Sequence, residues 1–305
     1  MGSAVGGFMS GAGHEVTLVG RAPHMEAVRR DGLRVTGIWG RHHFQGINAH
    51  TEADDLPSGT FDMVFLTVKS YDTPKALDLA ESVVDKDTVV CCYQNGLGNM
   101  EKTAERFGWS RTAGARTIYG VRVTEPGAIE ITVIANPTAL GVPRPEGPAG
   151  KMRVMAGAMQ AAGLPTVFTD RIETVLWAKV AYNCALNPLS ALLDANYGKL
   201  PEIPQARAMM DTIIDELYAV AAARSVTLEP SDPEAYRDLF YSKLVPPTAA
   251  HYASMHEDFR RRRRTEIDAL NGAIARMGAE SGIACPVNTF LTDLVHAREA
   301  AMGAG

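Results

Sequence analysis

The sequence predicts an α/β domain with a parallel sheet, followed by an all-helical domain. In the first half, near-continuous apolar runs of β-type residues alternate with helical segments, as in sheets covered by helices on both faces. After about residue 170, the apolar residues recur with the period of a helix. The length of 305 residues suffices for two domains with separate cores. We place these domains at 1–169 and 170–305.

In the first domain, the turn residues and the apolar runs define the elements. The expected elements are a helix rich in small residues over 1–13, strands over 14–21, 61–69 and 87–95, β structure over 111–142 with a turn at 125–127, a helix over 150–163 and a last strand at 165–168.

The second domain is expected to contain only helices, to hold the substrate of the protein and to support a homodimer. Its expected helices span 172–193, 204–224, 233–244, 248–264, 266–281 and 288–301. Ligands of such two-domain proteins bind at the carboxyl ends of the strands, near the second domain.

The helix expected over 172–193 is apolar on most of its circumference, which predicts a buried helix. Lys179, Asn183 and Asn187 follow one another at intervals of four residues, so they share one narrow stripe of this helix. Buried polar groups are costly unless they meet partners. The stripe is therefore either a structural network beside a wet groove, or a site where an ammonium gives a proton and two amides hold a polar ligand.

The composition, with 46% hydrophobic and 21% charged residues, is typical of a soluble globular protein. The net charge of −5 argues against a general nucleic-acid binder. No apolar run approaches the roughly 20 residues that span a bilayer, and the N-terminus lacks the charged region of a signal peptide. The four cysteines show no metal-ligand spacing. We expect them to be buried free thiols in the reducing cytoplasm.

The start of the chain suggests a Rossmann-type domain, which opens with a strand, a G-x-G-x-x-G turn and a helix. A helix, a strand and Arg21 follow Gly2 at the spacing expected after the third glycine. We therefore expect roughly ten further residues, with the first strand and the first two glycines, to precede Met1. An acidic residue after the second strand binds the ribose of NAD, whereas Arg21 suits the 2′-phosphate of NADP. Alternative basic neighbours are Arg29, Arg30, His42 and His43.

Eight sequence stretches carry a resemblance over essentially the whole chain. They are G-H-E-V-T-L-V-G-R at 13–21, V-K-S-Y-D at 68–72, Q-N-G-L-G-N at 94–99, T-E-P-G at 124–127, L-W-A-K-V-A-Y-N-C-A-L-N-P-L at 176–189, S-M-H-E-D at 254–258, R-R-T-E-I-D-A-L-N-G at 263–272 and G-I-A-C-P-V-N-T at 282–289. Together they resemble the ketopantoate reductase (2-dehydropantoate 2-reductase) family.

The resemblance implies NADPH-dependent reduction of a 2-oxo acid, with 2-dehydropantoate as the best single substrate and pantoate as its product. Lys179 matches the general acid, and Glu266 matches a glutamate beside the lysine and the nicotinamide. Asn183, Asn187 and Ser254 match residues that hold the hydroxyl and carboxylate of the substrate. A carboxylate such as Glu266 would keep Lys179 charged despite partial burial.

For the cofactor, the resemblance implies contacts from Lys69 and Asn95, which end two strands. Gly2, Arg21 and Glu266 complete the expected NADPH-binding set.

The sequence departs from the family pattern at two positions. Tyr197 precedes Gly198 where the family commonly has Asn, and His251 stands three residues before Ser254, where a family member has Asn. Both positions are expected to border the substrate pocket.

A reductase of another 2-oxo acid and a non-catalytic NADPH-binding protein are the alternative functions. The arginines at Arg260–Arg264 form a solvated helix end or reach the acidic substrate or cofactor.

Overall fold

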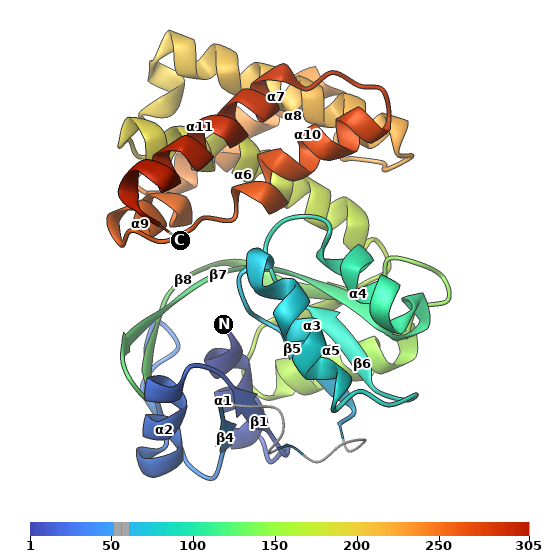
Figure 1. The fold of residues 1–305 in the computed structure, drawn as a ribbon, viewed down its shortest axis with the longest axis vertical. Coiled ribbons are helices and arrows are strands. Elements are labelled where there is room, and N and C mark those ends of the chain that lie inside the picture. The colour runs from blue at the N-terminus through green and yellow to red at the C-terminus, as the bar shows by residue number, and fades with distance from the viewer. Residues whose placement is uncertain (52–55, 57–60, 305) are drawn as a thin grey trace. The chain divides into compact units, whose positions relative to one another are not determined.

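A computed structural model describes residues 1–51, 56 and 61–304, and Figure 1 shows it as a ribbon. The chain forms two compact units, here called the N-terminal unit and the helical unit. The N-terminal unit comprises Met1–Gln94 and Asn99–Ile172, and the helical unit comprises Asn95–Gly98 and Glu173–Gly305. The short segment Asn95–Gly98 thus belongs with the helices, although it follows a strand of the N-terminal unit.

The N-terminal unit combines strands with five helices in the described part of the chain. Its strands are β1 (Thr17–Val19), β2 (Leu33–Gly37), β3 (His42–Phe44), β4 (Asn48–His50), β5 (Met63–Leu66), β6 (Val89–Cys92), β7 (Thr112–Glu125), β8 (Ala128–Gly141) and β9 (Thr166–Thr169). Its helices are α1 (Gly2–Gly11), α2 (Ala22–Asp31), α3 (Thr73–Glu81), α4 (Asn99–Phe107) and α5 (Ala149–Ala161).

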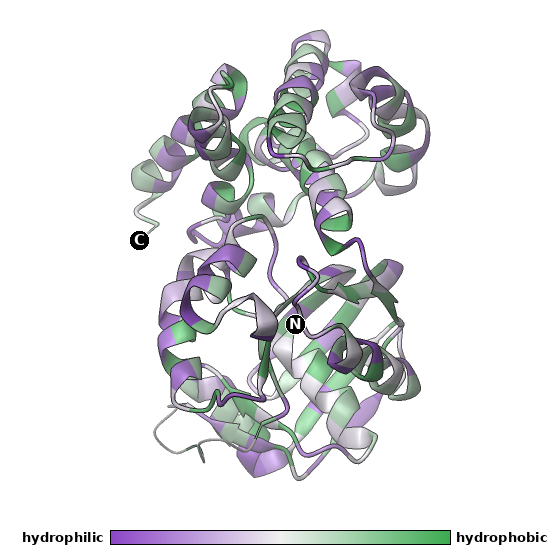
Figure 2. Ribbon diagram, turned by 90° about the vertical axis from the view of Figure 1, so that its right-hand side faces the viewer, coloured by the Kyte–Doolittle hydropathy of each residue, from purple (hydrophilic) through white to green (hydrophobic). Residues whose placement is uncertain are grey.

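The main sheet has the strand order β3-β2-β8-β7-β6-β5, and β9 also pairs with β8. Figure 2 colours the ribbon by the hydropathy of each residue. All four residues of β6, an inner strand of this sheet, are buried. The expectation of a parallel sheet was only partly right, because β7 and β8 pair antiparallel, as do β2 and β3. Only Pro126 and Gly127 separate β7 from β8, and so short a turn can join only antiparallel strands.

Strand β1 pairs with β4 in a separate, two-stranded parallel sheet, and β5 lies at one end of the main sheet. Helix α1 joins a hydrophobic core that includes residues of both sheets. Two glycines of α1 permit this contact: a Cβ would lie 2.6 Å from the Leu18 side chain at Gly6, and 2.9 Å from the Leu33 side chain at Gly7. The small residues of this helix thus allow close approach to the strands.

The helical unit contains the remaining helices. They are α6 (Ile172–Leu193), α7 (Pro204–Ala223), α8 (Pro233–Leu239), α9 (Ser254–Arg260), α10 (Asn271–Glu280) and α11 (Pro286–Met302). A single π-type turn, Phe240–Leu244, extends α8. The sequence predicted each of these helices, although two of them are shorter than expected.

The helix expected over 248–264 was wrong outside α9. The carbonyl oxygens of Ala249 and His251 accept hydrogen bonds from Gly198 N and Tyr197 N, both at 2.9 Å, so tertiary pairing replaces the helical bonds there. Arg262 ends the helix with a φ of 50°. The helix expected from 266 begins only at α10, since a 3₁₀ turn (Ile267–Ala269) precedes it.

Candidate active site

The polar stripe of α6 faces a site rather than the apolar core. Lys179 and Asn183 are partly buried, and Asn187 is 5% exposed. Most other residues of the helix are apolar, and Val180, Cys184 and several others are buried in the core. Because buried amides and ammonium groups require partners, the neighbours of this stripe decide what it can do.

Pro188 stands inside α6, directly after Asn187. A proline has no N–H, so the Cys184 carbonyl, four residues earlier, loses its helical hydrogen bond. Asn271 replaces that donor: its Nδ2 lies 3.1 Å from the Cys184 oxygen and 3.0 Å from Asn288 Oδ1. Both asparagines are fully buried. This network holds the turn of α6 that carries Asn187.

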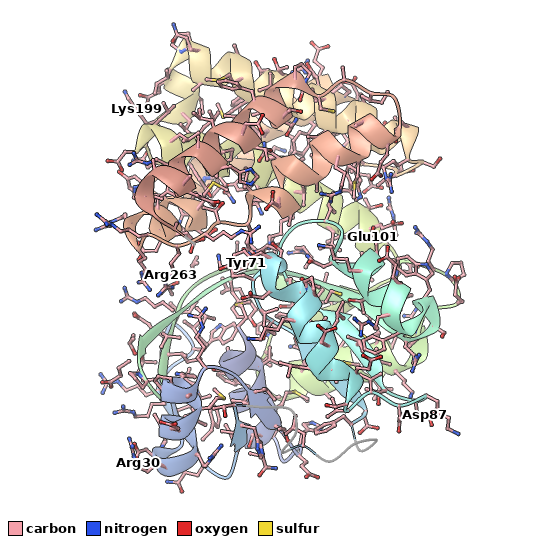
Figure 3. All side chains as sticks on the ribbon, viewed as in Figure 1. Arg30, Tyr71, Asp87, Glu101, Lys199 and Arg263 are labelled. Atoms are coloured by element: carbon pink, nitrogen blue, oxygen red, sulfur yellow. The ribbon has the colours of Figure 1, made fainter. Side chains whose placement is uncertain are left out.

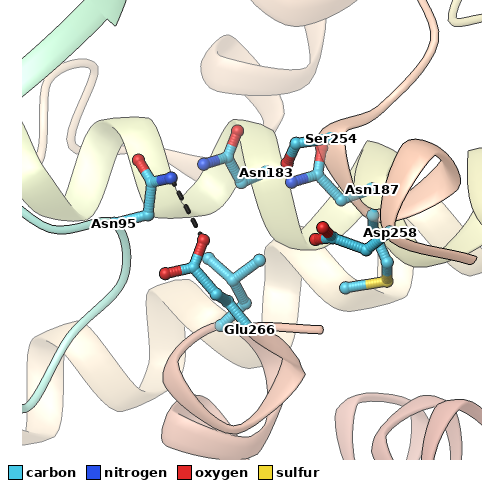
Figure 4. A pocket seen from close by; sticks show the side chains of 8 residues that line it. Asn95, Asn183, Asn187, Ser254, Asp258 and Glu266 are labelled. Carbon is cyan, nitrogen blue, oxygen red and sulfur yellow. Dashed lines mark hydrogen bonds between the residues drawn. The ribbon is translucent and has the colours of Figure 1, made fainter. Parts of the chain in front are cut away.

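A pocket with an empty volume of about 240 Å³ lies beside the stripe, within the helical unit (Figure 4). Met255 and Leu270 contribute apolar surface to it. Its polar lining residues are Asn95, Asn183, Asn187, Ser254, Asp258 and Glu266. Since most of these lining residues are polar, the pocket suits a small polar ligand.

The amide of Asn95 connects the lysine with the glutamate. Lys179 Nζ donates to Asn95 Oδ1 at 2.6 Å, and Asn95 Nδ2 donates to Glu266 Oε2 at 3.3 Å. An ammonium offers only donors and a carboxylate offers only acceptors, so the two charges fix the orientation of the amide. The resemblance implied a cofactor contact for Asn95. In the structure its side chain contacts both groups expected to be catalytic.

A close approach of two loops places Asn95 there. Leu97 N donates to Ala269 O at 2.8 Å. Gly96 has a φ of 83°, and a Cβ at this position would lie only 2.3 Å from Ala269 O. Only glycine fits both the backbone conformation and the contact. The glycine of the Q-N-G-L-G-N stretch therefore serves to bring Asn95 to the segment that carries Glu266.

Glu266 is 7% exposed and directly precedes the turn Ile267–Ala269. The residue before it is also held, because Thr265 N donates to Glu299 Oε1 of α11 at 2.6 Å. The side chain of Glu266 thus points into the pocket from a fixed backbone.

Asp258 was not among the residues that the sequence singled out. It is 8% exposed and lines the pocket, one turn of α9 after Ser254. The interval of four residues places both side chains on one face of the helix. That spacing was the available signal, but it does not distinguish a pocket carboxylate from a solvated one.

The other residues expected to bind the cofactor lie in the N-terminal unit. Gly2 begins α1, and a Cβ there would lie 2.7 Å from Thr67 Oγ1. Thr67 directly follows β5 and stands two residues before Lys69. The start of α1 is therefore next to the end of β5. Arg21 follows β1, is exposed and precedes the first turn of α2. These positions are at carboxyl ends of strands, where open α/β sheets bind ligands.

The arginines Arg260–Arg264 are all exposed, including Arg263, which Figure 3 labels. Arg261 pairs with Glu257 at 2.6 Å, and Arg264 pairs with Asp268 at 3.0 Å. Such exposed pairs are worth only about 0–1 kcal/mol. This arrangement favours the interpretation of the run as a solvated helix end.

Across residues 1–51, 56 and 61–304, every helix is too short or too polar to cross a membrane. The same residues contain no cluster of three or more His, Cys, Asp or Glu side chains suited to a metal ion. All four cysteines are buried free thiols, as expected. Burial raises their pKa values, that of Cys285 to about 11 and that of Cys92 to about 12, so these thiols stay protonated.

Solved structures share this fold over almost the whole chain. A PanE/ApbA family ketopantoate reductase from Ralstonia eutropha JMP134 superposes with a TM-score of 0.85 and 30% identity, covering 98% of this chain and 95% of that one. A D-mandelate dehydrogenase, solved with NADH and anilino(oxo)acetate, gives a TM-score of 0.84 and 26% identity, covering 99% and 96%.

Sequence comparisons agree with the structural ones. A 2-dehydropantoate 2-reductase from Aquifex aeolicus is 39% identical over 98% of this chain and 94% of its own length. The enzyme of that name from Pyrococcus horikoshii is 32% identical over 99% and 96%. Family models described as ketopantoate reductase PanE/ApbA and its C-terminal part match residues 1–144 and 171–299. The chain therefore belongs to the ketopantoate reductase family.

Proposed function

We propose that this protein reduces 2-dehydropantoate to pantoate with NADPH, as a step of pantothenate biosynthesis. The observation that carries the proposal is the connection of Lys179 to Glu266 through Asn95, beside a small polar pocket. The names of the relatives point to the same reaction. Buried free thiols are in keeping with a cytoplasmic enzyme.

Lys179 acts as the general acid. A nicotinamide, when bound, would supply the hydride, and hydride arrival at the carbonyl carbon of the substrate would leave negative charge on the oxygen. The Lys179 ammonium stabilises this charge and transfers a proton from Nζ to the oxygen, which completes the hydroxyl. Asn95 holds Nζ in place, and Glu266 in turn holds the amide of Asn95.

The remaining polar residues orient the substrate. Asn183, Asn187 and Ser254 offer hydrogen-bond donors for its carboxylate and hydroxyl. The Asp258 carboxylate repels a second carboxylate and accepts hydrogen bonds. Asp258 therefore directs the substrate carboxylate toward the amides and the serine. The substrate hydroxyl can then donate a hydrogen bond to Asp258.

The N-terminal unit offers the groups that a phosphorylated dinucleotide requires. The first-turn N–H groups of a helix attract phosphate oxygens, and α1 begins at Gly2, beside the end of β5. Lys69 adds a positive charge two residues after Thr67. Arg21 is exposed at the end of β1 and can pair with a 2′-phosphate. Together they support NADPH as the cofactor.

The direct test is turnover of 2-dehydropantoate by the purified protein. The loss of NADPH absorbance measures this turnover. We expect saturable turnover with a KM below about 1 mM, as is usual for enzymes acting on their own substrates. Absence of turnover at several millimolar 2-dehydropantoate would contradict this substrate.

A screen of other 2-oxo acids then separates the alternatives. The likeness to D-mandelate dehydrogenase makes the 2-oxo acid that corresponds to mandelate the first compound to compare. Turnover of that acid in preference to 2-dehydropantoate would identify a paralogous reductase. NADPH binding without reduction of any 2-oxo acid would identify a non-catalytic binding protein.

Replacing Arg21 by aspartate should shift the cofactor preference away from NADPH. The substitution removes a charge-assisted contact to the 2′-phosphate and adds repulsion, so the ratio of kcat/KM for NADPH over NADH should fall about 10–100-fold. Arg34→Asp is the matched control, since Arg34 is exposed on β2 and pairs with Glu125. An unchanged ratio in the Arg21 variant would place the phosphate site elsewhere.

A further inference from the structure

We infer that Tyr197 is a positioning residue for the substrate. Its hydroxyl holds the amide of Asn187 with the nitrogen toward the pocket, so that Asn187 donates a hydrogen bond to the substrate carboxylate. The inference deepens the proposed function and rests on it, because it concerns how the same pocket recognises a 2-oxo acid.

The hydrogen bond itself is short and buried. Tyr197 Oη donates to Asn187 Oδ1 at 2.7 Å, and the two residues are 4% and 5% exposed. Asn187 lines the pocket, and Figure 4 shows its side chain beside those of Asn183 and Ser254. Within the described chain, Nδ2 of Asn187 has no hydrogen-bond acceptor. A buried amide with one satisfied oxygen and one unused N–H₂ group offers a donor to a ligand.

The surroundings favour this orientation of the amide over the flipped one. Burial, with a smaller effect of nearby Tyr182, raises the pKa of Tyr197 well above its ordinary value, so the phenol keeps its proton. In a flipped amide, Nδ2 would face the phenol oxygen, and the phenol hydrogen would lose its acceptor. Oδ1 would then enter a pocket that already contains the carboxylates of Asp258 and Glu266. Both changes cost free energy.

Tyr197 is itself held in place by the segment before α9. Its backbone N donates to His251 O at 2.9 Å. Its ring contacts the rings of His251 and Tyr182 edge to face, at centroid distances of 5.4 and 5.9 Å. The two positions that depart from the family pattern, Tyr197 and His251, therefore touch each other and form one support beneath a pocket amide.

A donor at this position selects the chemistry of the ligand. The N–H₂ group of Asn187 pairs with an acceptor that carries negative charge, and the carboxylate of a 2-oxo acid is such a group. Ser254, which lines the same pocket, can donate to it as well. An amide that rotates freely would present its oxygen part of the time and repel that carboxylate.

The test is Tyr197→Phe, which removes only the hydroxyl and retains the ring contacts. With 2-dehydropantoate, KM should rise about 5–50-fold, since a buried polar contact is lost. The kcat value should change little, because Lys179 is untouched. In an Asn187→Ala background, Tyr197→Phe should have no further effect, since a residue that acts through another is not additive with it.

The control is Tyr182→Phe. Its hydroxyl bonds Thr248 rather than a pocket residue, so KM should not change. An unchanged KM in Tyr197→Phe would overturn the inference, and so would an equal rise in KM with and without Asn187. A fall in melting temperature alone would show a purely structural role.

A binding measurement separates this inference from the proposed substrate. Oxamate carries a carboxylate beside a carbonyl and is not reduced, so calorimetry reports its affinity without turnover. If the wild type binds oxamate but does not reduce 2-dehydropantoate, the substrate assignment fails, and a weaker oxamate affinity in Tyr197→Phe still supports the inference. If oxamate does not bind the wild type, the inference fails too.

Discussion

Replacing Lys179 by alanine should lower kcat about 10²–10⁴-fold, the usual contribution of a general acid. The variant leaves the alkoxide formed by hydride arrival without its ammonium partner and without a proton donor. NADPH affinity should change far less. The fold should persist, since Lys179 is only partly buried and its removal leaves an amide at the edge of a polar pocket.

The measurement is single-turnover reduction of the substrate by bound NADPH, with Lys199→Ala as the control. Lys199 is exposed and pairs with Glu202 on the surface at 2.8 Å, so its loss should not affect kcat. Added methylamine should partly restore the rate of Lys179→Ala, because a small ammonium can occupy the vacated position. If Lys179→Ala kept nearly full turnover in the absence of methylamine, Lys179 would have a structural role rather than a catalytic one.

The lysine and asparagine stripe could be predicted from sequence because a helix converts an interval of four residues into a shared face. Lys179, Asn183 and Asn187 needed no tertiary information beyond the apolar character of the rest of the helix. The hairpin of β7 and β8 was similarly local, since a Pro-Gly pair between two β runs defines it. Such features depend on near neighbours in the chain.

Asn95, Asp258 and the ends of two helices depended on distant neighbours instead. Asn95 follows a strand of one unit yet belongs to the other, because Gly96 allows its loop to meet Ala269 O. The carbonyl oxygens of Ala249 and His251 pair with the loop after α6. The periodicity of apolar residues does not indicate which distant N–H groups compete for a carbonyl. The helix predicted from this periodicity was therefore too long.

Replacing Glu216 by alanine should destabilise the helical unit by about 3–5 kcal/mol. Glu216 of α7 is 7% exposed and accepts hydrogen bonds at the start of α11: from Val287 N at 2.9 Å, from Asn288 N at 3.0 Å and from Asn288 Nδ2 at 2.7 Å. The residue before α11, Cys285, supplies no side-chain cap. Glu216 therefore replaces the missing cap from another helix, and its carboxylate suits the positive end of the helix dipole.

The loss would reach the active-site helix through a chain of buried amides. Without Glu216, Asn288 loses its acceptor, although it must still accept from Asn271, which satisfies the carbonyl freed by Pro188. Urea unfolding, monitored by circular dichroism, measures the effect, with exposed Glu202→Ala as a control expected within about 0.5 kcal/mol of the wild type. The stability of Glu216→Gln should be intermediate. Its amide oxygen still accepts a hydrogen bond, but its N–H₂ group faces N–H donors of α11. Equal stabilities of Glu216→Ala and Glu202→Ala would show that solvent replaces the cap, and that the position of Asn187 does not depend on this network.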